Sequence, residues 1–321
     1  MSTLVEPAAI RDAAQALRGI ATRTPLLPAD WISEAAGTEV RLKCENLQRA
    51  GAFKIRGAYT MISRLPEEAR RRGVITYSSG NHAQAVALAA RIFGIPAVVV
   101  MPTTAPDIKR EGARRLGAEV VLEGTTSIER QRRAEAIAAE RGLAIVPPFD
   151  HPDIIAGQGT VGLEILEDWP DVDAVLVPIG GGGLLAGIAA WIKRARPECR
   201  VIGVEPVGAD AMRRSLQAGT PTTIDVRHSI ADGLLPVRPG DLPFAHARAL
   251  VDDVVTVDDD AIADAARRLL TGSRLVVEFS GAATTAALLS GAWRGDARRI
   301  VLVLSGGNLD PTRAAAMLSG A

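Results

Sequence analysis

Short runs of aliphatic and β-branched residues alternate along the chain with longer segments of helical periodicity. The runs are EVRLK at 39, VITY at 74, AVVVM at 97, EVVL at 119, AVLVPI at 174, VIGVE at 201 and IVLVLS at 300. Such continuous apolar runs are typical of parallel strands that helices cover on both faces, because neither face meets water. The pattern therefore predicts an α/β fold with open, mostly parallel sheets covered by helices.

The spacing of these elements predicts two domains. Strand and helix alternate in a compact repeat from 74 to 146, and the turn-rich PPFDHP at 147–152 ends it. We therefore expect a small domain over residues 70–149, and a large domain formed by 1–69 together with 150–321. Ligands of open parallel sheets bind at the carboxyl ends of the strands, so a site is expected between the two domains.

Composition narrows the class of partner and the compartment. Lys plus Arg and Asp plus Glu both total 37, so no net charge would attract nucleic acid or an anionic membrane, and a small-molecule partner is expected. Cys44 and Cys199 are the only cysteines, which fits a reducing cytoplasm. The N-terminal segment predicts a surface helix rather than a secretory signal, and no apolar run approaches the roughly 20 residues of a membrane helix.

Four consecutive glycines follow the apolar strand at 174. They are Gly180, Gly181, Gly182 and Gly183, and an apolar helix start follows them. Because glycine has no Cβ, the backbone N–H groups of such a loop can approach an anion, and the helix N-terminus adds a positive dipole. The loop therefore predicts a phosphate site.

Two alternatives remain open for this loop. Gly181, Gly183 and Ala186 satisfy GxGxxA, and Glu205 ends the next strand, which together fit a dinucleotide fold. A tight turn that needs positive φ would explain glycine without any ligand. A Walker loop is excluded, because no Gly-Lys-Ser/Thr follows.

A lysine with apolar neighbours is a candidate nucleophile. Lys54 lies between Phe53 and Ile55, in a segment predicted to begin a helix after Gly51. Desolvation of its charged form would lower its pKa, as an amine nucleophile requires. The alternative is a surface lysine whose stem packs on apolar neighbours. Arg56 is expected to be a structural ion-pair partner.

Two further loops follow predicted strands and carry polar side chains. The first is the turn SSGNH, which comprises Ser78, Ser79, Gly80, Asn81 and His82. This turn opens a helix whose first N–H groups are suited to a carboxylate, although helix capping alone would explain its serines and asparagine. The histidine is equally compatible with a local structural role. The second loop, LSGGNLD, contributes Ser305.

The order of these motifs carries a resemblance that covers nearly the whole chain. The motifs are AFKIRGA, SSGNHAQA, AGQGT at 156, GGGGLLAGIA, GVEP at 203, ADG at 231 and LSGGN. The chain resembles the fold type II (β-family, tryptophan synthase β-like) pyridoxal-phosphate enzymes, and among them the threonine/serine dehydratase and serine racemase group. The resemblance implies a large cofactor-binding domain, a small substrate-side domain and a homodimer or homotetramer.

The resemblance also implies residue roles. Lys54 would hold pyridoxal 5′-phosphate as a Schiff base, with Phe53 beside it. The remaining cofactor contacts would be Asn81 at the 3′ oxygen, Gly180, Gly181, Gly182, Gly183 and Leu184 at the phosphate, and Ser305 at the pyridine nitrogen. The SSGNH turn would bind the substrate, with Ser79 as a second catalytic residue on the cofactor face opposite Lys54.

The implied reaction is elimination of water from L-threonine or L-serine, which yields a 2-oxo acid and ammonia. Three alternatives remain. The substrate would be another β-hydroxy amino acid, such as 3-hydroxyaspartate or a hydroxyectoine-pathway intermediate. The enzyme would be a serine racemase, because a proton returned by Ser79 inverts Cα. In another class, the chain would be a dinucleotide-binding protein.

Several positions depart from the group. Ala52 stands where serine usually precedes Phe-Lys, and Phe279 replaces the usual proline in VEFSGA. The group's divalent-cation site uses the glutamate of GVEP and a second carboxylate. Glu205 and Ala209 are only weak candidates for such a site, because Ala211 occupies the expected second position. The chain ends soon after LSGGN, so a C-terminal regulatory domain is not expected.

Overall fold

The computed structural model describes residues 4–78, 80–105, 107–225 and 228–319. Within these ranges the strands are β1 (Leu26–Pro28), β2 (Glu39–Lys43), β3 (Val74–Tyr77), β4 (Ala97–Met101), β5 (Glu119–Leu122), β6 (Ala144–Ile145), β7 (Ala174–Pro178), β8 (Arg200–Pro206), β9 (Asp253–Val257) and β10 (Arg299–Val303). All seven predicted strands are present, and β1, β6 and β9 were not predicted.

Helices of varied length connect and cover the strands. The α-helices of the described ranges are α1 (Pro7–Ala16), α2 (Asp30–Ala36), α3 (Lys54–Arg64), α4 (Glu67–Arg72), α5 (Asn81–Phe93), α6 (Asp107–Arg115), α7 (Ser127–Arg141), α8 (Pro152–Asp168), α9 (Gly183–Ala195), α10 (Ala211–Ala218), α11 (Asp241–Leu250), α12 (Asp259–Ser273), α13 (Phe279–Leu289) and α14 (Pro311–Ser319). Short 3-10 turns are η1 (Glu45–Leu47), η2 (Arg49–Gly51), η3 (Val207–Ala209) and η4 (Asp232–Leu234). None of the described helices is both long and apolar enough to cross a membrane.

The larger sheet has the strand order β1-β2-β10-β7-β8-β9, and all its pairs are parallel except β1 with β2. Successive side chains of a strand point to opposite faces, so the central strands bury both. Leu176 and Leu302 pack with α2, α12 and α13, whereas Val175 and Val301 pack with α8 and α9. Burial on both faces explains why these strands read as unbroken apolar runs.

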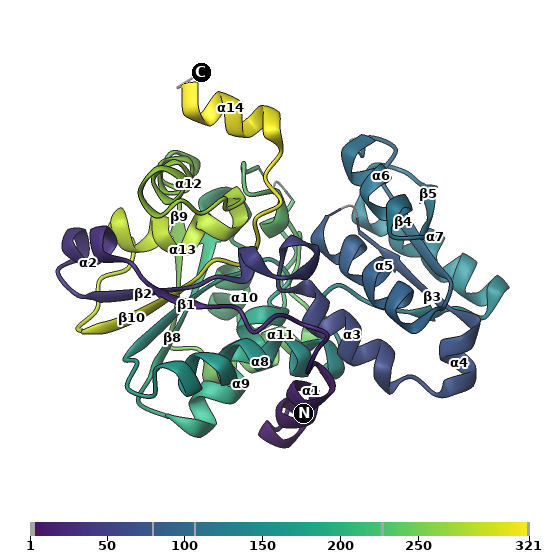
Figure 1. Cartoon of the computed structure of the whole chain (residues 1–321), viewed down its shortest axis with the longest axis horizontal. Coiled ribbons are helices and arrows are strands. Elements are labelled where there is room, and N and C mark those ends of the chain that lie inside the picture. The colour runs from purple at the N-terminus through teal and green to yellow at the C-terminus, as the bar shows by residue number, and fades with distance from the viewer. Residues whose placement is uncertain (1–3, 79, 106, 226–227, 320–321) are drawn as a thin grey trace.

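The smaller sheet has the order β5-β4-β3-β6 and is entirely parallel. Val99 faces α3 and α5, and Val98 faces α7, so helices cover this sheet on both sides as well. Figure 1 shows the two sheets in separate lobes, with α3 lying between them. Helix α3 packs both on α8 of the larger lobe and on α5 of the smaller one, which makes it the element shared by the two.

The three unpredicted strands lie at sheet edges or are very short. β1 and β9 are the two edges of the larger sheet, and β6 is an edge of the smaller one. The β9 sequence DVVTV mixes polar and apolar positions, and its burial is correspondingly mixed. An edge strand needs no continuous apolar run, so its sequence signal is weak.

Candidate active site

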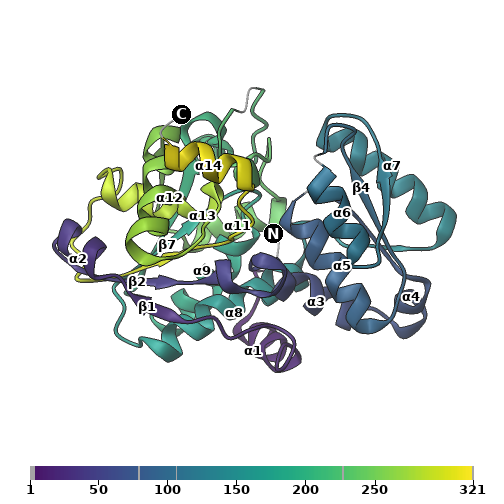
Figure 2. The ribbon, with the colours of Figure 1, turned by 45° about the horizontal axis from the view of Figure 1, so that its top comes forward.

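The candidate site lies where the carboxyl ends of β7 and β10 approach the start of α3 (Figure 2). The glycine loop follows β7, and the loop with Ser305 follows β10. The backbone N–H of Phe53 donates to the carbonyl of Ser305 at 3.2 Å, and Ala52 forms an isolated bridge with Gly306. The segments that carry Lys54 and Ser305 are therefore in direct contact, although about 250 residues separate them in sequence.

Lys54 is the first residue of α3, as the sequence predicts. Its Nζ donates to the carbonyl oxygen of Pro148 at 2.7 Å and lies 5.1 Å from the centre of the Phe53 ring. Burial lowers the pKa of the Lys54 ammonium to about 8, and the nearby carboxylate of Glu278 opposes only part of that shift. The amine is thus within reach of its neutral, nucleophilic form near physiological pH.

The glycine loop is packed too tightly for side chains. A Cβ on Gly181 would lie 2.1 Å from Cδ1 of Phe149, and Gly182 has a φ of 92°, a value that favours glycine. Within the described chain, none of the amide groups from Gly180 to Leu184 donates to another residue. The loop therefore presents five amides at the N-terminus of α9, which is the arrangement that binds a phosphate.

A chain of side-chain amides lies at the start of α5. Asn81 Nδ2 donates to Glu278 Oε1 at 2.7 Å, and Asn81 Oδ1 accepts from Asn308 Nδ2 at 2.8 Å. Asn308 Nδ2 also donates to the carbonyl of Ala50 at 2.8 Å. Glu278 is buried, and desolvation raises its pKa to about 7. The smaller lobe and the Ser305 loop therefore meet through Asn81.

The SSGNH turn leads into α5 as predicted. The Oγ of Ser78 accepts from the amide of Gly80 at 3.4 Å, and the predicted catalytic residue Ser79 lies outside the described residues. The amides of Asn81 and His82 donate to no residue in the described ranges, so they are available to a carboxylate.

The His82 side chain is buried. Its Nε2 is 3.0 Å from the carbonyl oxygen of Val146, and its Nδ1 has no hydrogen-bond partner among the described residues. Burial, reinforced by the charge of Lys54, lowers the pKa of His82 to about 3. The imidazole is therefore neutral at physiological pH, with its Nε2 directed at the strand-end carbonyl.

The weak metal candidates do not form a carboxylate cluster. Both carboxylate oxygens of Glu205 accept backbone amides, from Met212 at 2.8 Å and Arg213 at 2.9 Å. Ala209 and Ala211 contribute no side-chain oxygen, and the described residues contain no group of three or more potential metal-binding side chains. Glu205 instead satisfies amides in the first turn of α10, and burial raises its pKa to about 8.

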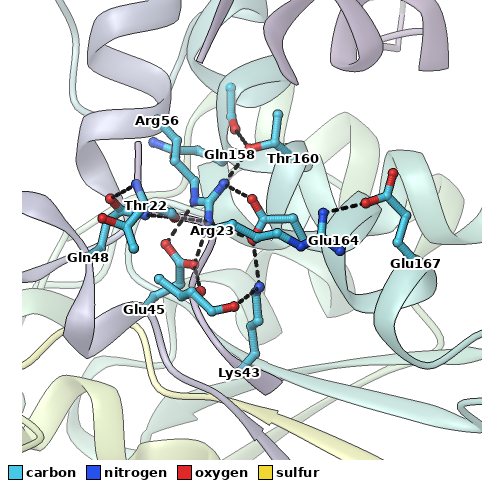
Figure 3. A network of polar contacts seen from close by, with 12 residues as sticks. Thr22, Arg23, Lys43, Glu45, Gln48, Arg56, Gln158, Thr160, Glu164 and Glu167 are labelled. Carbon is cyan, nitrogen blue, oxygen red and sulfur yellow. Dashed lines mark hydrogen bonds and ion pairs between the residues drawn. The ribbon is translucent and has the colours of Figure 1, made fainter. Parts of the chain in front are cut away.

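A buried cluster of four charges holds α3 against the larger lobe (Figure 3). The Arg56 guanidinium donates to Glu45 at 2.8 Å and to Glu164 at 2.7 Å, and Lys43 Nζ donates to Glu164 at 2.6 Å. All four side chains are almost completely buried, with opposite charges in equal number. The prediction that Arg56 is a structural ion-pair partner is confirmed.

Sequence reasoning missed Glu278, Pro148 and Phe149 as neighbours of the candidate site. Glu278 stands in the VEFSGA segment. In that segment the sequence drew attention to the unusual Phe279 and not to the glutamate before it. Pro148 and Phe149 stand in the PPFD segment, which the sequence marked as a turn-rich break and as similar to the dehydratase pattern, but not as a neighbour of the site. A carboxylate next to an apolar run gives no local signal of its partner, because Asn81 lies 197 residues away.

The described residues fit pyridoxal phosphate. A phosphate matches the five unpaired amides of the glycine loop, and an aldehyde matches the Lys54 amine, whose pKa is low enough to release a nucleophile. The second N–H of the Asn81 amide is available to the ring's 3′ oxygen, because only one is used by Glu278. Ser305 offers a neutral hydroxyl on the adjoining loop.

Comparisons with known proteins agree with this fit. Residues 17–306 match the family described as pyridoxal-phosphate dependent enzyme. An L-threonine ammonia-lyase of Thermotoga maritima is 46% identical over 301 residues, which covers 94% of this chain and 75% of the relative. An L-threo-3-hydroxyaspartate ammonia-lyase of Pseudomonas sp is 40% identical over 310 residues, which covers 96% of this chain and 97% of the relative.

A solved structure extends the agreement to the fold. The structure of maize serine racemase superimposes with a TM-score of 0.95 at 38% identity, covering 99% of this chain and 98% of the other. The predicted α/β fold class, the predicted family and the predicted cofactor are thereby confirmed. The chain belongs to the pyridoxal-phosphate-dependent enzymes.

Proposed function

We propose that this protein is an ammonia-lyase that eliminates water from L-threonine or L-serine and releases a 2-oxo acid and ammonia. The observation that carries the proposal is the position of Lys54, whose low-pKa amine lies beside the Ser305 loop and near the carboxylate of Glu278. The 46% identity to an L-threonine ammonia-lyase supports this reaction over others of the family.

Lys54 is the proposed attachment point and base. Bound pyridoxal phosphate supplies an electron sink for the charge left when Cα loses its proton. Lys54 takes that proton once the substrate amine has freed its Nζ, and the low polarity around it favours the neutral amine. Ser305 offers the ring nitrogen a hydroxyl, a far weaker acid than a pyridinium, which favours elimination over transamination.

The remaining residues position the reactants. We assign the cofactor phosphate to the amides of the glycine loop, including Leu184, and the 3′ oxygen to Asn81. The amides at the start of α5 would bind the substrate carboxylate with Ser78, Gly80 and His82 around them, because a helix N-terminus favours negative charge. Ser79 remains a proposed second catalytic residue on the opposite face.

A second candidate substrate is 3-hydroxyaspartate. The 40% identity to an L-threo-3-hydroxyaspartate ammonia-lyase, over 97% of that relative, favours it. A dicarboxylic substrate needs one more cationic partner than threonine. Lys109, whose charge is felt by Glu278, is paired with Asp232 at 2.8 Å, so it would have to exchange that carboxylate for the substrate's.

The test is release of 2-oxo acid and ammonia by the purified, cofactor-loaded protein with L-threonine, L-serine, D-serine and 3-hydroxyaspartate. Lys54→Ala should lower the rate at least about 100-fold, as expected when a general base is removed. Lys193→Ala is the matched control, because that lysine pairs with Asp252 at the surface. Cofactor-loaded protein that releases no oxo acid from any substrate, or that only racemises serine, would refute the lyase.

We also propose that the two lobes act as the two domains predicted from the sequence, 1–69 with 150–321 and 70–149. The strands of the smaller sheet all lie between 74 and 145, which supports the boundaries.

Light scattering of the purified enzyme would test the proposed homodimer or homotetramer. Both cysteines are free and buried, which is compatible with the proposed cytoplasmic location.

A further inference from the structure

Glu278 is a buried carboxylate that the proposed reaction does not use. Its side chain is 7% exposed, and its Oε1 accepts from Asn81 Nδ2 at 2.7 Å. We infer that Glu278 is a positioning residue that fixes the side-chain amide of Asn81, so that the second N–H of this amide is directed at the cofactor's 3′ oxygen. The inference rests on the proposed role of Asn81 in cofactor binding.

The hydrogen bonds of Asn81 allow only one orientation of its amide. Glu278 is an acceptor, and Asn308 Nδ2 is a donor to Asn81 Oδ1. Rotation of the amide by 180° would set Asn81 Oδ1 against the carboxylate and its NH₂ against the NH₂ of Asn308. Both hydrogen bonds would be lost, and the buried carboxylate of Glu278 would face an oxygen instead of a donor.

The loop after β10 brings Glu278 and Asn81 together. The amide of Glu278 donates to the carbonyl of Gly306 at 3.0 Å. A Cβ on Gly306 would lie 2.4 Å from Glu278 Oε1 and 3.1 Å from Asn81 Nδ2, so only glycine permits this approach. The LSGGN motif therefore serves three contacts, through Ser305, Gly306 and Asn308.

The electrostatic surroundings do not change this geometry. Burial and the charge of Asp232 raise the pKa of Glu278, while the Asn81 hydrogen bond and the charges of Lys109 and Lys54 lower it. A protonated carboxyl group keeps its carbonyl oxygen as an acceptor. The orientation of Asn81 is therefore expected to survive protonation of Glu278.

The test measures cofactor binding and the near-visible absorption of the bound cofactor, neither of which depends on turnover. Glu278→Leu removes the acceptor without a cavity and should weaken cofactor binding about tenfold, the loss expected for one charge-assisted hydrogen bond. It should also shift the absorption band. Glu278→Gln keeps an acceptor oxygen and should bind the cofactor within about threefold of the parent. The loss is smaller because a neutral acceptor still makes the hydrogen bond, although a weaker one than a charged acceptor makes.

Coupling to Asn81 distinguishes positioning from general damage. If Glu278 acts through Asn81, Glu278→Leu should weaken cofactor binding by less than a further factor of about two in an Asn81→Ala background. The effects of substitutions at contacting residues do not add. Ser280→Ala is the control for damage at the start of α13, since its hydroxyl accepts from Gly233 and not from Asn81. Melting curves followed by circular dichroism identify variants that fail to fold, and if Glu278→Leu is one of them, Glu278→Met, which also lacks the carboxylate acceptor, takes its place in both backgrounds.

Each outcome is decisive. A full tenfold loss of cofactor affinity for Glu278→Leu in the Asn81→Ala background would overturn the inference. A tenfold loss of affinity for Glu278→Gln, or an unshifted absorption band in Glu278→Leu, would overturn it as well. A parent protein that binds no pyridoxal phosphate would instead refute the proposed function. The two failures are thereby separated.

Discussion

The environment of Lys54 has a consequence for pH. Its pKa is lowered to about 8, and only the neutral amine attacks an aldehyde. Capture of pyridoxal phosphate by the cofactor-free protein should therefore accelerate as the pH rises through about 8 and level off above it. Stopped-flow absorbance measures the rate of capture from pH 6 to about pH 10, which approaches the pKa of an ordinary lysine.

Lys54→Ala should not form the Schiff-base absorption band at any pH, whereas Lys193→Ala should reproduce the parent profile. A rate that shows no levelling above pH 8 and is still rising at about pH 10, towards the ordinary lysine value of 10.5, would show that burial does not perturb this amine in solution. At the residue scale, the sequence identified Lys54 from its apolar neighbours. It did not identify Glu278, whose charge opposes the pKa shift of Lys54.

The glycine loop depends on one close contact at the scale of an element. Gly181→Ala would place a methyl group 2.1 Å from the Phe149 ring, so the loop must move and its amides lose their alignment. Cofactor affinity should fall at least about tenfold, the loss expected for one phosphate hydrogen bond. Absorbance titration with pyridoxal phosphate measures the change.

Phe149→Ala in the same chain tests the cause. Because the smaller side chain removes the clash, the double variant should regain part of the affinity lost by Gly181→Ala. If the double variant binds no better than Gly181→Ala, the contact with Phe149 does not set the loop. Four glycines in sequence predicted a phosphate loop, but the ring that forbids side chains there was visible only in the fold.

Helix α3 is anchored by buried charge. Arg56→Met leaves Glu45 and Glu164 buried with Lys43 as the remaining cation of the cluster, and breaking such a cluster costs about 3–5 kcal/mol. A large drop in the thermal midpoint is expected, measured by circular dichroism. Arg141→Met is the control, because its pair with Glu119 is about half exposed and solvent screens it, so its loss should change stability little. Equal effects of the two changes would contradict a structural role for the cluster.

At the scale of the whole molecule, one ion pair bridges the two lobes near the site. Lys109 on α6 lies 2.8 Å from Asp232 of η4, and the amide of Gly233 anchors that turn to Ser280 at 2.8 Å. Both charged side chains are partly exposed, so the pair is worth about 0.2–1 kcal/mol. Lys109→Met should therefore raise KM for the substrate by at most about fivefold.

Steady-state kinetics at low and high salt check this bridge. The difference between parent and Lys109→Met should shrink as salt screens the pair. Lys109→Asp should raise KM more than Lys109→Met does, because it places a second carboxylate against that of Asp232. The exchanged pair, Lys109→Asp with Asp232→Lys, should restore the KM of the parent. An exchanged pair no better than Lys109→Asp alone would show that the bridge does not hold the lobes together.

The sequence by itself determined the central strands, the family and the residues of the motifs. Strands such as β7 and β10 are buried on both faces, and burial requires an unbroken apolar run that is visible locally. Lys54, the four glycines and Ser305 each stand in a short segment whose composition suits one chemical task. Local chemistry can therefore be read without knowledge of the fold, although the role of Ser79 stays a prediction.

Only the tertiary structure decided which distant side chains meet. Glu278 contacts Asn81 across 197 residues, Arg56 contacts Glu164 across 108, and Lys109 contacts Asp232 across 123. Hydrophobic periodicity records whether a position is buried, but not which neighbour it meets, because that depends on how the two sheets and α3 pack. The edge strands β1 and β9 escaped prediction for a related reason, since their hydrogen-bonded neighbour, rather than their own composition, makes them strands.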